Sequence, residues 1–225
     1  MFLSTFQIFK IGIGPSSSHT MGAYAASARF LENLRRSDRE VPGSGKAARL
    51  GASLHGSLAF TGKGPATDRA VILGLMGFLP DTLDPDAAEV LEDKVRKNGR
   101  VTVVGLGDLD FDPANNLVFD YGPPLQGHAN GLVLRAFDIG GRPCLTRTYY
   151  SIGGGFVAMP EELTRSHGTP KAPIPHCPYP FCTAAEMLVM GRASGLSIAS
   201  MKRANELAVG GAGLDGRLET ASGMR

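Results

Sequence analysis

The sequence predicts a mixed α/β (α+β) fold, in which helices pack on a mixed β-sheet. Apolar residues recur at helical spacing in three stretches, at 23–34, 69–78 and 86–97. Four further runs are rich in strand-forming residues, at 101–106, 117–121, 132–138 and 144–151. Gly140 and Gly141 separate the last two of these runs, which predicts a hairpin and therefore antiparallel strands.

The first half of the chain contains further signals that bound these elements. Apolar and polar residues alternate over 50–58, as expected for a strand with one buried face. Thr67 or Asp68 is expected to cap the helix at 69–78. Gly99 follows the charged helix before it and is expected to end that helix. Strands and helices therefore intermix along the chain.

Composition divides the chain into three predicted regions. We expect a first domain at 1–158 and a proline-rich connector of extended chain at 159–182. The third region, at 183–225, is expected to form a short helical C-terminal tail, with helices at 183–192 and 197–208. This tail reads as the start of a further domain rather than as the closing element of a core.

Charge and cysteine content exclude several classes of protein. A net charge of +2 over 225 residues argues against an obligate nucleic-acid binder. No apolar run is long enough to span a bilayer, and no signal peptide is evident, so we expect a cytoplasmic protein that does not enter membranes. Cys144, Cys177 and Cys182 are odd in number and unevenly spaced, which predicts neither a disulfide framework nor a complete metal site.

A hydroxyl-rich loop precedes the first helix. Ser16, Ser17, Ser18, His19 and Thr20 follow a Gly-Pro turn and lead directly into helical sequence. Backbone N–H groups at a helix start lack partners and lie at the positive end of the helix dipole, so the loop is suited to an anion. Helix capping alone is the competing interpretation, although one serine would suffice for it.

Two later loops also carry candidate binding residues. Lys63 lies between two glycines ahead of Thr67, which indicates an anion ligand, although a solvated lysine is the more common role. His128 and Asn130 are two residues apart in a glycine loop and are candidates for a small polar ligand. A turn in which Asn130 adopts positive φ explains that second loop equally well.

Three consecutive glycines, at 153–155, directly follow the last predicted strand. Such a run usually marks backbone packed against another strand, a partner domain or a ligand. A flexible linker is the alternative, but aromatic and apolar residues on both sides argue against it.

With these loops in hand, the chain resembles the β domain of bacterial iron–sulfur-dependent L-serine dehydratase (L-serine ammonia-lyase). The resemblance extends from about residue 6 to 205 and rests on long motifs. They are FKIGIGPSSSHTMG at 9–22, GSLAFTGKG with TD at 56–68, HANG at 128–131, YYSIGGGF at 149–156 and PYPF at 178–181.

The resemblance implies deamination of L-serine to pyruvate and ammonia, in serine breakdown and gluconeogenesis. It also implies a [4Fe-4S] cluster, whose cysteine ligands lie in a larger α domain and hence outside this chain, and a homodimer. It implies a fold similar to the allosteric substrate-binding domain of phosphoglycerate dehydrogenase. The chain alone is then expected to be inactive without its α partner. A non-catalytic serine-binding, regulatory or assembly module is the alternative function.

The resemblance also suggests roles for individual residues. Elimination requires a base for the Cα proton and an anchor for the carboxylate. His19 is the expected proton carrier, with Lys63 as a second catalytic residue. The substrate ligands are expected to be Ser16, Ser17, Ser18, Thr20 and Thr67, and His128 with Asn130 are the candidates for a regulatory serine site. The family pattern usually has a histidine after GKG, where this chain has Pro65, and proline cannot transfer a proton.

Overall fold

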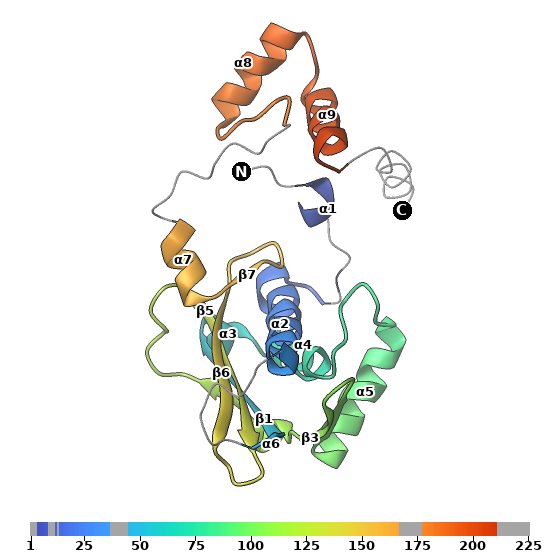
Figure 1. The fold of residues 1–225 in the computed structure, drawn as a ribbon, viewed down its shortest axis with the longest axis vertical. Coiled ribbons are helices and arrows are strands. Elements are labelled where there is room, and N and C mark those ends of the chain that lie inside the picture. Colours follow the sequence, from blue (N-terminus) through green and yellow to red (C-terminus); the bar gives the residue numbers. More distant parts are fainter. Residues whose placement is uncertain (1–3, 9–11, 13, 37–44, 167–176, 211–225) are drawn as a thin grey trace. The chain divides into compact units, whose positions relative to one another are not determined.

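The computed structural model describes most of the chain, and the contacts divide it into two units. The larger unit spans Ile11–Gly168, and the smaller combines Met1–Lys10 with Thr169–Arg225. The described residues are 4–8, 12, 14–36, 45–166 and 177–210 (Figure 1). Within these residues, no helix is long and apolar enough to cross a membrane.

The larger unit is built on a seven-stranded mixed sheet, which confirms the predicted fold class. The strands are β1 (Ala47–Gly56), β2 (Arg100–Val103), β3 (Gly107–Asp110), β4 (Leu117–Asp120), β5 (Asn130–Asp138), β6 (Pro143–Ser151) and β7 (Val157–Ala158). Their order is β2-β3-β1-β5-β6-β7, and β4 also pairs with β1. Antiparallel pairing of β5 with β6 confirms the hairpin expected at the two glycines.

Strand β1 is the centre of the sheet. It pairs in parallel with β3 and β4 on one side and antiparallel with β5 on the other, with Leu54 opposite Leu132. Its alternate residues Leu50, Ala52 and Leu54 enter the hydrophobic core. This alternation is the one that the sequence predicts for 50–58, although the strand ends at Gly56.

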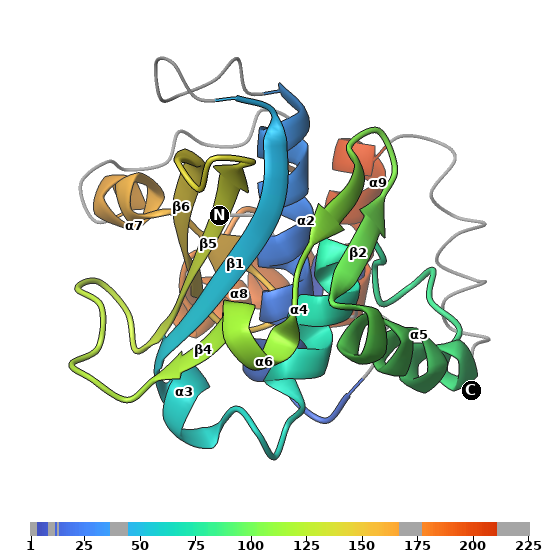
Figure 2. The same cartoon turned by 90° about the horizontal axis from the view of Figure 1, so that it is seen from below.

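Helices cover the core face of the sheet. They are α2 (Gly22–Arg36) and α4 (Thr67–Leu75), which pack against each other, and α5 (Pro85–Asn98), which packs on α4 and β2 (Figure 1, Figure 2). As expected, Gly99 ends α5 with positive φ. Four shorter elements complete the unit: η1 (Ser17–Met21), a π-helical turn, α3 (Ser57–Thr61), α6 (Pro113–Asn116) and α7 (Pro160–Ser166).

The predicted side-chain cap of α4 is wrong. The residue in the capping position is Ala66, which makes no side-chain cap, and Thr67 already belongs to the helix. Ala66 has φ of 55° and is the one non-glycine residue with positive φ in the described part of the chain. The GKG loop therefore enters the helix through an unfavourable backbone conformation rather than through a hydroxyl cap.

The glycine run after β6 forms the turn that joins β6 to β7. Gly153, Gly154 and Gly155 have φ values of 91°, 59° and 69°, a region that other residues rarely adopt. A side chain added at Gly153 would meet open space. The turn explains the positive φ of all three glycines, and an added Cβ at Gly154 would in addition lie 3.2 Å from the Phe156 ring.

The smaller unit contains α1 (Thr5–Ile8), α8 (Ala184–Ser194) and α9 (Ile198–Gly210), of which the last two confirm the predicted helices. On α9, the Glu206 carboxylate accepts hydrogen bonds from the Ser4 hydroxyl and the Thr5 amide, at 2.8 and 2.5 Å. Part of the predicted extended connector is instead helix α7. Residues 167–176 of that connector and 211–225 of the predicted tail lie outside the described residues, and the predicted domain boundaries stay predictions.

Candidate active site

The serine loop folds around the side chain and carbonyl of Ser16. The Ser16 hydroxyl accepts from the His19 amide at 3.2 Å, and the Ser16 carbonyl accepts from the Thr20 and Met21 amides at 3.0 and 3.3 Å. These three amides are therefore satisfied within the loop. An anion at this loop would be held mainly by side-chain hydroxyls, and Ser17 is the exposed one of the group.

The His19 ring lies among hydroxyl groups from two elements. Its Nδ1 is 3.0 Å from the Ser18 hydroxyl, and its Nε2 is 2.8 Å from the hydroxyl of Thr61 on α3. Ser57, at the start of α3, places its hydroxyl 3.4 Å from the same Nε2. Strand β1 ends at Gly56 and α3 begins at Ser57, so the end of the central strand places α3 against the serine loop.

The hydrogen bonds around Thr61 determine the tautomer of His19. The Thr61 hydroxyl donates its single proton to the Ser57 carbonyl at 2.8 Å, so it can only accept from His19. The network therefore assigns the ring proton to Nε2 and leaves Nδ1 as the acceptor of the Ser18 proton. A base at this position would act through Nδ1, on the side of the serine loop.

The GKG loop contacts the serine loop through position 65. The buried Thr20 hydroxyl donates to the Pro65 carbonyl at 3.0 Å, so the two motifs singled out in the sequence lie against each other. A side chain at Gly62 would lie 2.1 Å from the Leu58 carbonyl, so this turn requires glycine. The residue that departs from the family pattern thus lies beside the candidate site.

Lys63 and Thr67 are placed differently from the serine-loop residues. The Lys63 ammonium lies 5.7 Å from the centre of the Phe119 ring, within the range of a cation–π interaction, and the lysine is exposed. Thr67 is completely buried, and its hydroxyl has no hydrogen-bond partner among the described residues. Neither side chain contacts His19 in this structure, whereas Ser16 and Ser18 do.

The HANG segment adjoins the same end of β1. The Ala129 carbonyl accepts from the Ser57 amide at 2.8 Å, and the Asn130 side-chain amide donates to the Ser151 carbonyl at 3.2 Å. The Asn130 amide donates to Nδ1 of His128 at 3.1 Å. Asn130 is the first residue of β5 and has no positive φ, so the turn interpretation of this residue is wrong.

Sequence reasoning missed Ser57 and Thr61 as site residues. Both are hydroxyl residues inside the GSLAFTGKG motif, four positions apart, which places them on one face of a helix. The sequence predicts a strand to residue 58 and a loop from Thr61, so the two hydroxyls are not expected on one helical face. Only the short helix α3 brings both hydroxyls to His19.

A buried histidine on β1 was also missed. His55 places Nε2 2.9 Å from the Ser53 hydroxyl and Nδ1 3.4 Å from the Asp120 carboxylate, while Arg135 donates to the same serine at 3.0 Å. Burial lowers the pKa of His55, and the Arg135 charge adds to this, against the opposing effect of Asp120. A neutral, fully bonded imidazole fits a structural role better than proton transfer.

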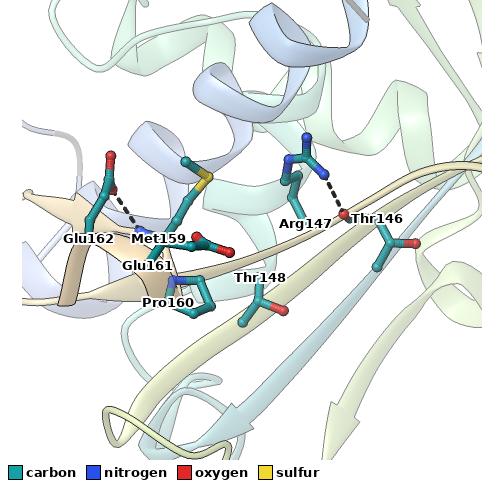
Figure 3. Close-up of a pocket in the computed structure, with 7 residues that line it drawn as sticks. All are labelled: Thr146, Arg147, Thr148, Met159, Pro160, Glu161 and Glu162. Carbon is teal, nitrogen blue, oxygen red and sulfur yellow. Dashed lines mark hydrogen bonds between the residues drawn. The ribbon is translucent and has the colours of Figure 1, made fainter. Parts of the chain in front are cut away.

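One surface cavity lies apart from these residues. It has a volume of about 490 Å³ and is lined by Thr146, Arg147, Thr148, Met159, Pro160, Glu161 and Glu162. Figure 3 shows Arg147 on one side of strand β6 and the two threonines on the other. None of the residues predicted to bind substrate lines this cavity.

Comparison with known proteins agrees with the motifs. Residues 4–162 match the family model described as serine dehydratase beta chain. The chain belongs to this family. Its match includes all of the candidate residues, from the serine loop to the HANG segment. In this chain, the serine loop, the GKG loop and the HANG segment lie at one end of the central strand.

Relatives of this β chain are named as L-serine dehydratases. The chain is 38% identical over 208 residues to L-serine dehydratase of Streptomyces coelicolor and 39% identical over 208 residues to L-serine dehydratase TdcG of Escherichia coli K12. It is 37% identical over 209 residues to the Helicobacter pylori 26695 protein. The matches cover 92% of this chain but only 43–44% of those proteins, so the chain spans less than half of their length.

The family resemblance implies an iron–sulfur cluster, and the described residues do not fit one. They contain no group of three or more His, Cys, Asp or Glu side chains that could hold a metal ion. Cys144 is buried on β6, where its thiol donates to the Gly45 carbonyl at 3.4 Å. Cys177 and Cys182 belong to the smaller unit. A cluster would have to be bound by ligands outside these residues.

Proposed function

We propose that this chain supplies the β part of an L-serine ammonia-lyase, which converts L-serine to pyruvate and ammonia. We use the term α part for the portion of the relatives that this chain does not cover. The observation that carries the proposal is the position of His19, between the Ser18 and Thr61 hydroxyls where the two family motifs meet. Under this proposal the chain alone is inactive, and activity requires both parts.

In the proposed reaction, His19 accepts the proton from Cα of serine through Nδ1. The Cβ–O bond then breaks, and the departing hydroxide leaves as water, with its proton supplied from the α part. The resulting enamine tautomerises to an imine, which water hydrolyses to pyruvate and ammonia. Substrate must displace the Ser18 hydroxyl from Nδ1, so His19 becomes a base only when the site is filled.

The hydroxyl residues have distinct roles in this proposal. Ser16 and Ser17 donate to the substrate carboxylate, because the Ser16 hydroxyl uses only its lone pair in capping. Lys63 contributes positive charge to the site after leaving the Phe119 ring. Thr20 holds the two loops together through Pro65, and the buried Thr67 stabilises the GKG loop, because its amide donates to the Gly62 carbonyl at 2.9 Å.

The remaining parts of the proposal concern the surroundings of the enzyme. They are a [4Fe-4S] cluster whose ligands all lie on the α part, a homodimer, a cytoplasmic location and a role in serine breakdown that feeds gluconeogenesis.

Anaerobic co-expression of the chain with an α part, followed by a pyruvate assay, tests this function. We expect His19→Gln to lower kcat by about 10²-fold or more, the usual contribution of a positioned base. His128→Gln is the matched control, because it removes an imidazole from the neighbouring loop. Wild-type activity in His19→Gln would refute the role of His19, and no pyruvate from an intact wild-type complex would refute the lyase function.

A non-catalytic serine-binding or regulatory module is the second candidate. Pro65 favours it, because position 65 lies beside Thr20 in the site and cannot carry a proton. His128 and Asn130 are the candidate ligands of such a regulatory site. Calorimetry of the chain alone with L-serine distinguishes the two candidates: binding that is lost in Asn130→Ala but kept in His19→Gln would establish the regulatory site.

A further inference from the structure

Two exposed aromatic side chains lie beside the candidate active site. Phe60 on α3 is 63% exposed and Tyr121 after β4 is 54% exposed. Their rings stack edge to face, with 5.3 Å between centroids. In the described part of the chain they are the only aromatic residues among the large hydrophobics classed as exposed. We call Phe60, Tyr121, Phe119 and Lys63 the aromatic patch.

The aromatic patch is continuous with the residues around His19. Phe60 directly precedes Thr61, whose hydroxyl is 2.8 Å from His19. Helix α3 and strand β4 lie side by side (Figure 2). Tyr121 directly follows β4, and its ring contacts that of Phe60 on α3. Lys63 adds a positive charge over the Phe119 ring. The patch therefore combines aromatic area and a cation at the rim of the candidate site.

Such a surface is unusual unless something covers it. Scattered aliphatic residues at the surface are ordinary, as with Ile139 at the hairpin and Val90 on α5, which are 93% and 69% exposed. An exposed, stacked pair of aromatic side chains has the composition of an interface hot spot, because aromatic residues are enriched at protein interfaces.

We infer that the aromatic patch is the docking surface for the α part, with Phe60 and Tyr121 as its anchors. The inference rests on the proposed function. We assign the α part as the partner on this surface because more than half of the length of the relatives lies outside the region that this chain matches. The position of the patch supports the same assignment, because a part docked on Phe60 would lie next to His19. The docked segment should present apolar side chains to the rings of Phe60 and Tyr121.

The test measures association rather than turnover. The chain is co-expressed with a tagged α part, taken as the remainder of the Streptomyces coelicolor relative, and the dissociation constant of the purified complex is measured. We expect Phe60→Ala and Tyr121→Ala each to weaken binding by tenfold or more. Val90→Ala and Ile139→Ala are the matched controls and should stay within twofold of wild type. Circular dichroism shows whether each variant is folded.

Three results would overturn the inference. The first is the absence of binding by the wild-type chain, and the second is binding by Phe60→Ala and Tyr121→Ala as tight as that of the controls. The third is self-association of the chain alone that these two variants abolish, because a second copy would then be the occupant. His19→Gln should bind normally. A tight, patch-dependent but inactive complex would therefore refute the proposed function and leave the docking surface supported.

Discussion

Substitution of Gly22 by alanine tests how the serine loop is joined to the sheet. Gly22 is the first residue of α2 and directly follows the serine loop. A Cβ atom there would lie 2.0 Å from the Ser151 Oγ and 2.6 Å from its Cβ. Both residues are buried, and Ser151 is the last residue of β6. A rotamer change moves Oγ but not Cβ, so the backbone must move.

The expected cost follows from that contact. Carbon atoms in contact normally lie about 3.5–4.0 Å apart, so the helix start and β6 must separate by about 1 Å. Overpacking of this kind costs about 1–3 kcal/mol, and the higher helix propensity of alanine returns up to about 1 kcal/mol. We expect a net loss of about 2 kcal/mol in the free energy of unfolding. That loss corresponds to a fall in Tm of about 4–8 °C for a chain of this size.

Urea unfolding of a double-mutant cycle is the assay. Ser151→Gly removes both clashing atoms, so Gly22→Ala should cost at least about 1 kcal/mol less in that background than in wild type. Gly64→Ala is the matched control, because nothing lies within 4 Å of the added atom. Equal costs of Gly22→Ala in the two backgrounds, or a cost no larger than that of Gly64→Ala, would refute the argument.

Two other predictions concern strain and pH. Ala66→Gly should raise the free energy of unfolding by about 0.5–1 kcal/mol, because φ of 55° is unfavourable for alanine. The control Ala87→Gly, within α5, should lower the free energy of unfolding by about 1 kcal/mol. A loss of stability in Ala66→Gly would contradict the assigned backbone conformation. The pKa of His55 is lowered in the folded chain, so the unfolded chain binds more protons and stability falls as pH drops below about 6.5. Urea titrations between pH 8 and 5 should show a smaller fall in His55→Gln, and an unchanged fall would exclude this histidine as the cause.

The sequence predicts the long elements of this fold well. Helix α2 and strands β1, β5 and β6 each carry several periods of their apolar pattern, and the structure confirms all of them. Elements of four or five residues, such as β3 and α3, contain too few periods to reveal their type. They form because tertiary packing selects them.

The candidate site illustrates the same limit. Ser16, Ser18 and His19 are predicted as a group because they are adjacent in sequence. Their contact with Thr61 is not predictable from spacing, because it depends on β1 ending two residues earlier than the alternation over 50–58 suggests. Pairing with β5 ends at Gly56, whose added side chain would lie 2.3 Å from the Ala129 carbonyl. Strand β1 thus ends at Gly56, and helix α3, which contains Ser57 and Thr61, begins at the next residue.

The number of residues in strand β1 therefore determines which side chains face the core and which reach the candidate site. Leu54 faces the core, His55 faces the opposite side, and Ser57 reaches His19 two positions later. Deleting one residue from the middle of β1 would shift the later residues of the strand by one position and turn each of them to the opposite face. Such a deletion would move Leu54 out of the hydrophobic core, point His55 into it and withdraw the hydroxyls of α3 from the serine loop. The length of this strand is thus as strictly constrained as the identity of the residues that it delivers.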